Sequence, residues 1–289
     1  MKEFLKYFVL LLITTLLIAY LLDYGFSKVY EKAFPRNKIS LAYSGKAENY
    51  DIVFLGSSRA NNHFVPQVFM DKGYKSYNYG MSGSRLEENA LLLELLIENG
   101  TKIQNLVVEV DLNINSNGYS DGTRALFYPY LKKSETIRNY YKNLPDFKKN
   151  YYVPFYRFLH YDAKIGTREL FFTAIKKPSK LLQNYGYYAL EGKGKKMSAD
   201  LSSNYPKNNV AYEYIKNLCK KNNINLIAVT TPMCQNIKNI DYFDQVVKLY
   251  PEIYNLENVV TDDEYFSSCG HMNDQGAKIF SQFILEKFF

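Results

Sequence analysis

The chain has 289 residues, enough for one large α/β domain with additions or for two smaller domains. Hydrophobic residues make up 47% and charged residues 22%, which excludes a disordered, collagen-like or disulfide-scaffold protein, while the negative mean hydropathy excludes a multi-spanning membrane protein. The net charge of +7 permits anionic partners without identifying one, and three cysteines without a C-x-x-C pair exclude zinc-ribbon and thioredoxin-like sites.

Residues 7–22 form an uncharged apolar run, YFVLLLITTLLIAYLL. As a helix this run measures about 24 Å against a bilayer core of about 30 Å, and Lys6 with the flanking tyrosines extends it towards a full crossing. We expect an uncleaved single-pass anchor over 1–24, because no convincing small-x-small signal-peptidase site follows the run. The basic residues on its two sides do not favour export of the body.

Residues 25–49 are polar and mixed, and predict a stalk. The body then alternates short apolar runs with helical patterns, which is typical of a doubly wound parallel sheet in a three-layer α/β/α domain over 50–289. The predicted strands are 51–55, 75–79, 105–110 and 225–230, and the predicted helices are 87–98, 210–222 and 274–289. Because ligands bind at the carboxyl ends of such strands, functional residues should follow each strand directly.

A segment at about 114–205 interrupts this alternation and is basic and rich in tyrosine. Three interpretations are open: a nucleic-acid surface, a groove for sugar or an anionic polymer, and a solvated helical insertion that its own tyrosines pack. We favour the insertion. No nucleic-acid module accompanies the basic residues, so we expect no nucleic-acid partner.

Polar and small residues follow the strands as expected. Gly56-Ser57-Ser58 ends the first strand, Asn78–Ser84 follows the second, Asp111–Asn113 follows the third, and His271 lies in a polar loop before the last helix. Each has a simpler structural interpretation: a helix cap for the serines, an ordinary turn for the glycines, and a structural role for a lone histidine. Their shared position at one sheet edge favours a site.

These residues together resemble the SGNH (GDSL-like) hydrolase superfamily, in order along almost the whole body. Ser58 takes the nucleophile position of the first block, Gly83 ends the second block, Asn113 takes the asparagine position of the third, and His271-Met-Asn-Asp-Gln-Gly resembles the last block. The family's usual aspartate three residues before the histidine is Ser268 here. Asp262 and Asp263 are candidates for a substitute acid.

The resemblance implies a flavodoxin-like SGNH fold in which Ser58 is the nucleophile and His271 the base. Ser58, Gly83 and Asn113 would then form the oxyanion hole, with no metal or organic cofactor. Cys234 and Cys269 can pair beside this site in an oxidising compartment, although we favour two unpaired thiols.

The GSSR form of the first block, with one amino-terminal anchor, resembles most the branches that acylate cell-surface polymers, such as the teichoic acid D-alanylation protein and the alginate acetylation proteins. The resemblance therefore implies a serine esterase or O-acyltransferase that acts on an acylated cell-envelope glycan from outside the cytoplasmic membrane. The alternative is a non-catalytic SGNH-like surface protein that binds glycan or scaffolds a membrane acyltransferase.

Overall fold

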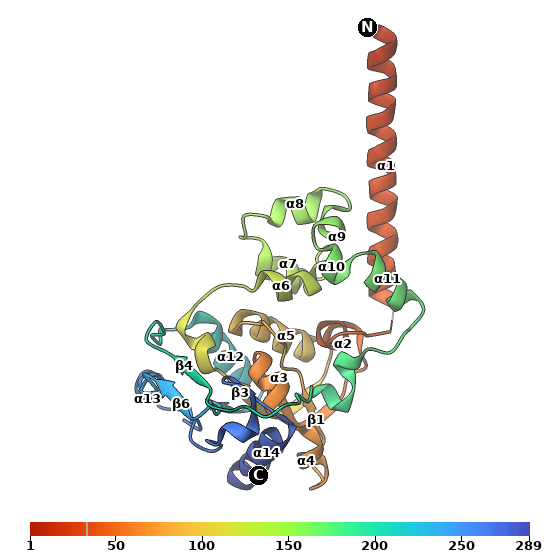
Figure 1. Cartoon of the computed structure of the whole chain (residues 1–289). Coiled ribbons are helices and arrows are strands. Elements are labelled where there is room, and N and C mark those ends of the chain that lie inside the picture. The colour runs from red at the N-terminus through yellow and green to blue at the C-terminus, as the bar shows by residue number, and fades with distance from the viewer. Residues whose placement is uncertain (33) are drawn as a thin grey trace. The chain divides into compact units, whose positions relative to one another are not determined.

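The computed structural model describes residues 1–32 and 34–289, which separate into two compact units (Figure 1). Unit 1 consists of Met1–Gly45 and Arg124–Pro178, and unit 2 consists of Lys46–Thr123 and Ser179–Phe289. The unit boundaries fall inside the predicted stalk and inside the predicted insertion. Part of the predicted stalk and part of the predicted insertion therefore belong to unit 1, which is helical.

Unit 2 is built on a four-stranded parallel sheet with the strand order β2-β1-β3-β5. Its strands are β1 (Asn49–Leu55), β2 (Ser76–Asn78), β3 (Lys102–Glu109) and β5 (Asn225–Val229). Its longest helices are α5 (Leu86–Glu98), α12 (Val210–Lys221) and α14 (Asp274–Phe288). These elements confirm the four predicted strands, the three predicted helices and the parallel sheet.

Unit 2 also contains shorter elements. They are α3 (Ser58–His63), α4 (Pro66–Met70), η1 (Asp111–Asn115), η3 (Lys180–Leu182), η4 (Asn184–Gly186), β4 (Ser198–Asp200), β6 (Asn236–Lys238), α13 (Tyr242–Leu249), η5 (Asp263–Tyr265), β7 (Phe266–Ser268) and β8 (His271–Met272). Strands β7 and β8 form an antiparallel hairpin immediately before α14.

The sheet is buried on both faces. Ile52 and Phe54 point to one face of β1 and Val53 and Leu55 to the other, and all four are completely buried. Phe54 stacks on Phe64 after α3 at 4.8 Å, within a cluster that also contains residues of α14. Each such buried side chain contributes about 1.5–3 kcal/mol to folding, so this cluster fixes α3 and α14 beside β1.

Unit 1 is helical. It contains α1 (Lys2–Lys32), α2 (Lys38–Ser44), η2 (Ala125–Tyr130), α7 (Glu135–Tyr141), α8 (Phe147–Tyr152), α9 (Tyr156–His160), α10 (Asp162–Ile165) and α11 (Thr167–Ala174), and the one-turn helix α6 (Asp121–Arg124) lies at its boundary with unit 2. Tyrosines contribute to its interior: Tyr128, Tyr130 and Tyr141 are buried, and rings meet in the Tyr128–Tyr141 and Tyr43–Tyr130 contacts. The interpretation of residues 114–205 as one helical insertion stays a prediction, and Arg124–Pro178 is the part of it that lies in this unit.

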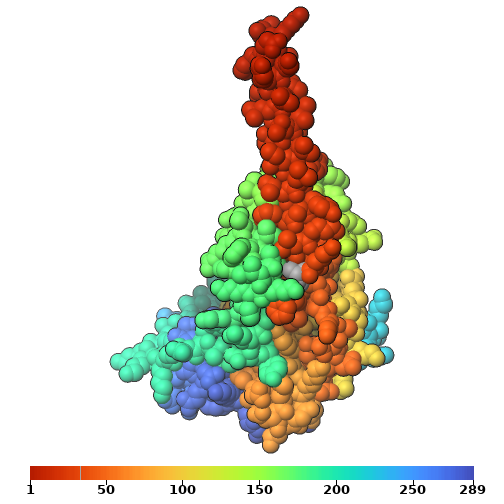
Figure 2. Space-filling view, turned by 90° about the vertical axis from the view of Figure 1, so that its right-hand side faces the viewer, coloured from red at the N-terminus to blue at the C-terminus, as the bar shows by residue number. Residues whose placement is uncertain are grey.

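Helix α1 changes character at Asp23. Residues 2–22 are almost entirely exposed, and within unit 1 the amino-terminal part of α1 stands clear of the other helices (Figure 2). By length and composition, α1 alone among the described helices could span a membrane. From Asp23 onwards, buried residues face the rest of unit 1, so the predicted stalk begins as a packed continuation of α1.

The cysteines show the arrangement that the sequence analysis did not favour. Cys234 and Cys269 form a disulfide, and Cys219 is free and buried. The backbone brings the two cysteines together, because the Cys234 N–H donates to the Cys269 carbonyl over 2.9 Å. The disulfide therefore ties the chain after β5 to the loop that carries His271.

Candidate functional site

The first component of the site is the turn from β1 into α3. Ser57 caps α3, its Oγ accepting from the Arg59 N–H over 3.2 Å, and Ser58 is the first residue of the helix. Gly56 has a φ of +145°, and a Cβ there would lie 2.7 Å from Glu109 Oε2. Only glycine fits at this position, so β1 can turn sharply and present Ser58 at the carboxyl end of the sheet.

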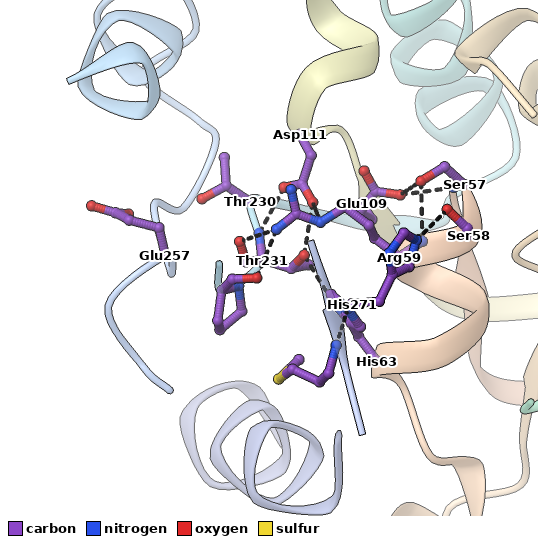
Figure 3. A network of polar contacts seen from close by, with 12 residues as sticks. Ser57, Ser58, Arg59, His63, Glu109, Asp111, Thr230, Thr231, Glu257 and His271 are labelled. Carbon is purple, nitrogen blue, oxygen red and sulfur yellow. Dashed lines mark hydrogen bonds and ion pairs between the residues drawn. The ribbon is translucent and has the colours of Figure 1, made fainter. Parts of the chain in front are cut away.

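Ser58 and His271 are in direct contact. Ser58 Oγ lies 2.8 Å from His271 Nε2, and Ser268 Oγ lies 3.1 Å from His271 Nδ1 (Figure 3 shows Ser58 and His271). An imidazole whose Nε2 accepts the Ser58 proton must carry its own proton on Nδ1, which then donates to Ser268. The hairpin of β7 and β8 sets this geometry, because it pairs Ser268 with His271.

The surroundings of His271 favour its neutral form. Burial is the main cause that lowers its pKa below the usual 6.5, and the charge of Arg59 lowers this pKa further. The negative charge of Glu109 acts in the opposite direction. A neutral imidazole beside a serine hydroxyl is the protonation state that a general base requires.

Glu109, at the end of β3, was not predicted as a site residue. It is completely buried, and its Oε2 accepts both the N–H and the hydroxyl of Ser57, each at 2.7 Å. A charged residue is rarely buried without partners, so this carboxylate serves to fix the cap of α3. A lone acid in the otherwise apolar run Leu-Val-Val-Glu-Val was the sequence signal that could have identified it.

A second buried network of polar side chains joins α3 to the backbone beside His271 (Figure 3). Arg59 Nε lies 2.7 Å from Asp111 Oδ2, which also accepts the Thr231 hydroxyl at 2.7 Å. Thr231 Oγ1 lies 3.0 Å from His63 Nδ1, and His63 Nε2 accepts the Met272 N–H over 3.1 Å. Burial lowers the pKa of His63, which fits this neutral, bridging role. The network fixes the backbone directly after the candidate base.

The turn after β2 approaches α3 closely. The Asn78 side chain donates to the carbonyls of Ala60 and Phe64 and accepts the Gly80 N–H, so Asn78 has a structural role. A Cβ on Gly80 would lie 2.6 Å from the Asn61 nitrogen. Gly83 has a φ of +78°, and a Cβ added there would lie no closer than 3.9 Å to another side chain.

One cavity brings all four predicted site residues together. It measures about 330 Å³ and is lined by Ser58, Gly83, Asn113 and His271, with Arg59, Arg85 and Glu109 among its other residues. This volume is within the range of small-molecule sites. Gly83 and Asn113 thus lie in the same cavity as the Ser58–His271 pair, and their roles in an oxyanion hole remain predictions.

Neither candidate substitute acid contacts His271. Asp263 is buried and accepts the N–H groups of Met197 and Gln235, and Asp262 caps η5 through the Glu264 N–H. Ser268 therefore occupies the position beside Nδ1, and neither Asp262 nor Asp263 takes its place. Among residues 1–32 and 34–289, no group of three or more His, Cys, Asp or Glu side chains is arranged to hold a metal ion.

No protein-family model matches the chain, and the curated proteins include no match to it. A solved structure described as "a putative platelet activating factor from Streptococcus pneumonia" matches over 98% of this chain and 99% of its own, with 12% identity and a TM-score of 0.32. This likeness is too distant to support an argument about function.

Proposed function

We propose that the chain is a serine esterase or O-acyltransferase that acts through an acyl-enzyme on Ser58. The observation that carries the proposal is the 2.8 Å contact of Ser58 Oγ with His271 Nε2 at the rim of a substrate-sized cavity. Burial adds to it by favouring the neutral imidazole. A serine, a neutral base and backbone donors at a helix start are the components that acyl transfer needs.

In the proposed reaction, Ser58 Oγ attacks the ester carbonyl carbon while His271 Nε2 takes the hydroxyl proton. The N–H groups of Ser58 and Gly83, with the Asn113 amide, stabilise the oxyanion. The tetrahedral intermediate collapses, and the leaving alcohol takes the proton from His271. Water or a sugar hydroxyl then attacks the acyl-Ser58 ester while His271 Nε2 accepts its proton. The second tetrahedral intermediate expels Ser58 Oγ, which takes that proton back from His271, and the products are those of hydrolysis or transfer respectively.

The resemblance to surface-polymer acylation proteins extends the proposal to location and substrate. In it, α1 anchors the chain in the cytoplasmic membrane, the body is extracytoplasmic, and the substrate is an acylated cell-envelope glycan. The disulfide Cys234–Cys269 supports an oxidising compartment. A three-layer SGNH wrapping of the parallel sheet and cooperation with a membrane acyltransferase belong to the same proposal.

The second candidate is a non-catalytic protein that binds glycan or scaffolds a membrane acyltransferase. Ser268 favours it, because a hydroxyl orients His271 but supplies no charge to stabilise the imidazolium. Loss of the triad carboxylate costs up to about 10⁴ in rate, although the oxyanion hole alone retains about 10³–10⁴ over water.

An activated-serine probe separates the two candidates. The full chain in detergent is treated with a fluorophosphonate, and the same is done with Ser58→Ala and Ser57→Ala. The enzyme proposal expects labelling of the natural protein and of Ser57→Ala, and its loss in Ser58→Ala. Folded natural protein that remains unlabelled, or labelling that persists in Ser58→Ala, would contradict the Ser58 mechanism.

A further inference from the structure

The end of the apolar run in α1 coincides with a buried ion pair. Asp23 directly follows Leu22, and its carboxylate contacts Arg157 Nη1 and Nη2 at 2.8 and 3.1 Å. The Phe155 N–H donates to the same carboxylate over 2.8 Å, and Lys132 Nζ lies 3.1 Å from it. These contacts hold the start of α9 at the level of residue 23.

The turn between α8 and α9 is rigidly built at this level. Phe155 has a φ of +63°, which is rare for an aromatic residue, and its ring contacts Phe26 of α1 at 4.8 Å. The backbone between Tyr152 and Phe155 is thus fixed beside the first turn of α1 after the apolar run. If α1 spans a bilayer, this turn lies at the membrane–water interface.

The exposed side chains around this turn are those that an interface accepts. Tyr152, Val153 and Leu159 are 66%, 46% and 67% exposed. Lys148 and Lys149, on α8, are exposed as well. Tyrosine is favoured at the level of lipid headgroups, aliphatic side chains enter the acyl boundary, and lysines are attracted to anionic lipids.

We propose that the α8–α9 turn is a membrane-contacting surface that binds the interface of an anionic bilayer beside α1. We call it the interfacial turn, and it consists of Lys148, Lys149, Tyr152, Val153 and Leu159. The inference rests on the proposed membrane anchor, with which the surface is continuous, and on the complementarity of its lysines to anionic headgroups. The interfacial turn would give α1 a second contact with the membrane and hold unit 1 against it.

The first test measures depth with single fluorophores on the full chain in nanodiscs. Val153→Cys is compared with Ile175→Cys, which is 55% exposed in the same unit. Ala174 and Lys176 line a hollow with Lys28 and Lys32, which lie about 9 and about 15 Å beyond Leu22 along α1, so residue 175 is a control position farther from the interface. Since Cys219 is buried and the other cysteines are paired, they should not react.

Spin-labelled lipids with headgroup-level quenchers should quench the fluorophore at 153 several-fold more than the one at 175. Equal quenching at the two positions would overturn the interfacial turn. Ile13→Cys reports on α1 itself, with quenchers placed deep in the acyl chains. Quenching at 13 without quenching at 153 refutes only the surface, whereas no quenching at 13 refutes the anchor as well.

The second test addresses the lysines. Lys148→Glu/Lys149→Glu is compared with Lys176→Glu/Lys177→Glu, a neighbouring exposed pair of unit 1. Each lysine near an anionic surface contributes about fivefold to local binding. In discs with added phosphatidylglycerol, the first variant should lose most of the quenching at 153 and the second should keep it. A loss of equal size in both variants, or in neither, would contradict a role for Lys148 and Lys149.

Discussion

At the scale of single residues, His271 determines the expected pH dependence. A protonated imidazole cannot accept the Ser58 proton, so the proposed activity is lost as pH falls through the pKa of His271. Burial and Arg59 lower this pKa below 6.5. We therefore expect the acidic limb of kcat/KM on a small acetyl ester to be centred below pH 6.5. A decline centred above pH 6.5 would contradict this assignment.

Glu109 offers a test of the same electrostatics. Its negative charge raises the pKa of His271, so Glu109→Gln should move the acidic limb of the pH–rate profile to lower pH. The amide keeps the volume beside Ser57 but gives up the carboxylate that accepts two hydrogen bonds, so a lower maximal rate should accompany the shift. Glu48→Gln, at an exposed ion pair, serves as the control and should leave the profile unchanged.

The hydroxyl of Ser268, in place of a carboxylate, leads us to expect a low kcat on generic esters. Its hydroxyl lies 3.1 Å from His271 Nδ1, where a carboxylate would stabilise the imidazolium. Ser268→Asp should raise kcat on a generic ester, by up to about 10⁴ if the new carboxylate reaches Nδ1. Ser267→Asp adds the same charge one residue earlier, on the residue whose hydroxyl contacts the His271 carbonyl, and should not raise the rate. A similar increase in both variants would indicate a general charge effect.

At the scale of elements, two glycines have backbones in the left-handed region. Comparing an alanine substitution at each distinguishes a loss of stability caused by backbone strain from a loss of activity. Gly83 lies on the cavity with a φ of +78°, and Gly73 lies in the turn between α4 and β2 with a φ of +91°. Neither has an atom within 3.4 Å of an added Cβ, so each change to alanine should cost about 1–2 kcal/mol through backbone strain alone.

Gly83→Ala and Gly73→Ala should therefore lower the thermal midpoint by similar amounts. Only Gly83→Ala should also reduce kcat, because its N–H is proposed to face the oxyanion. Parallel melting and single-turnover measurements check this difference. Equal activity of the two variants would remove Gly83 from the proposed oxyanion hole.

The elements also show what the sequence could predict. The apolar runs of β1, β3 and β5 are continuous because the strands are buried on both faces, and that pattern is visible in one sequence. The place of His271 near Ser58 was predicted from the shared sheet edge of a doubly wound fold and from the order of motifs. Glu109, Arg59 and Asp111 were missed as partners, because burial of a charge depends on contacts between segments that no local pattern records.

Unit 1 is a second case in which contacts between distant segments could not be predicted from local sequence patterns. A stalk was predicted from polar composition over 25–49, but Phe26 and Tyr30 of α1 pack against Phe158. These aromatic contacts join segments more than a hundred residues apart. Composition alone describes such a segment as mixed, since it cannot show which face of a continuing helix is covered.

At the scale of the whole molecule, the redox state of the three cysteines shows whether the body lies in an oxidising compartment. Burial raises the pKa of Cys219 to about 12, so this thiol should not react while the protein is folded. Alkylation of protein trapped from intact cells should modify no cysteine in the folded chain and one after denaturation. All three should react after denaturation with reduction. If all three cysteines were alkylated in the denatured, unreduced sample, the body would lie in a reducing compartment.

The ion pair at Asp23 also has a consequence for membrane thickness. Helix α1 cannot slide along its axis, because moving Asp23 away would leave Arg157 as a buried, unpaired charge, at a cost of about 3–5 kcal/mol. An apolar run of about 24 Å that is fixed at one end cannot adjust to a thick bilayer by shifting its register. The lipids must adapt instead, so a spanning α1 should partition preferentially into thin regions of membrane and thin the bilayer around itself elsewhere.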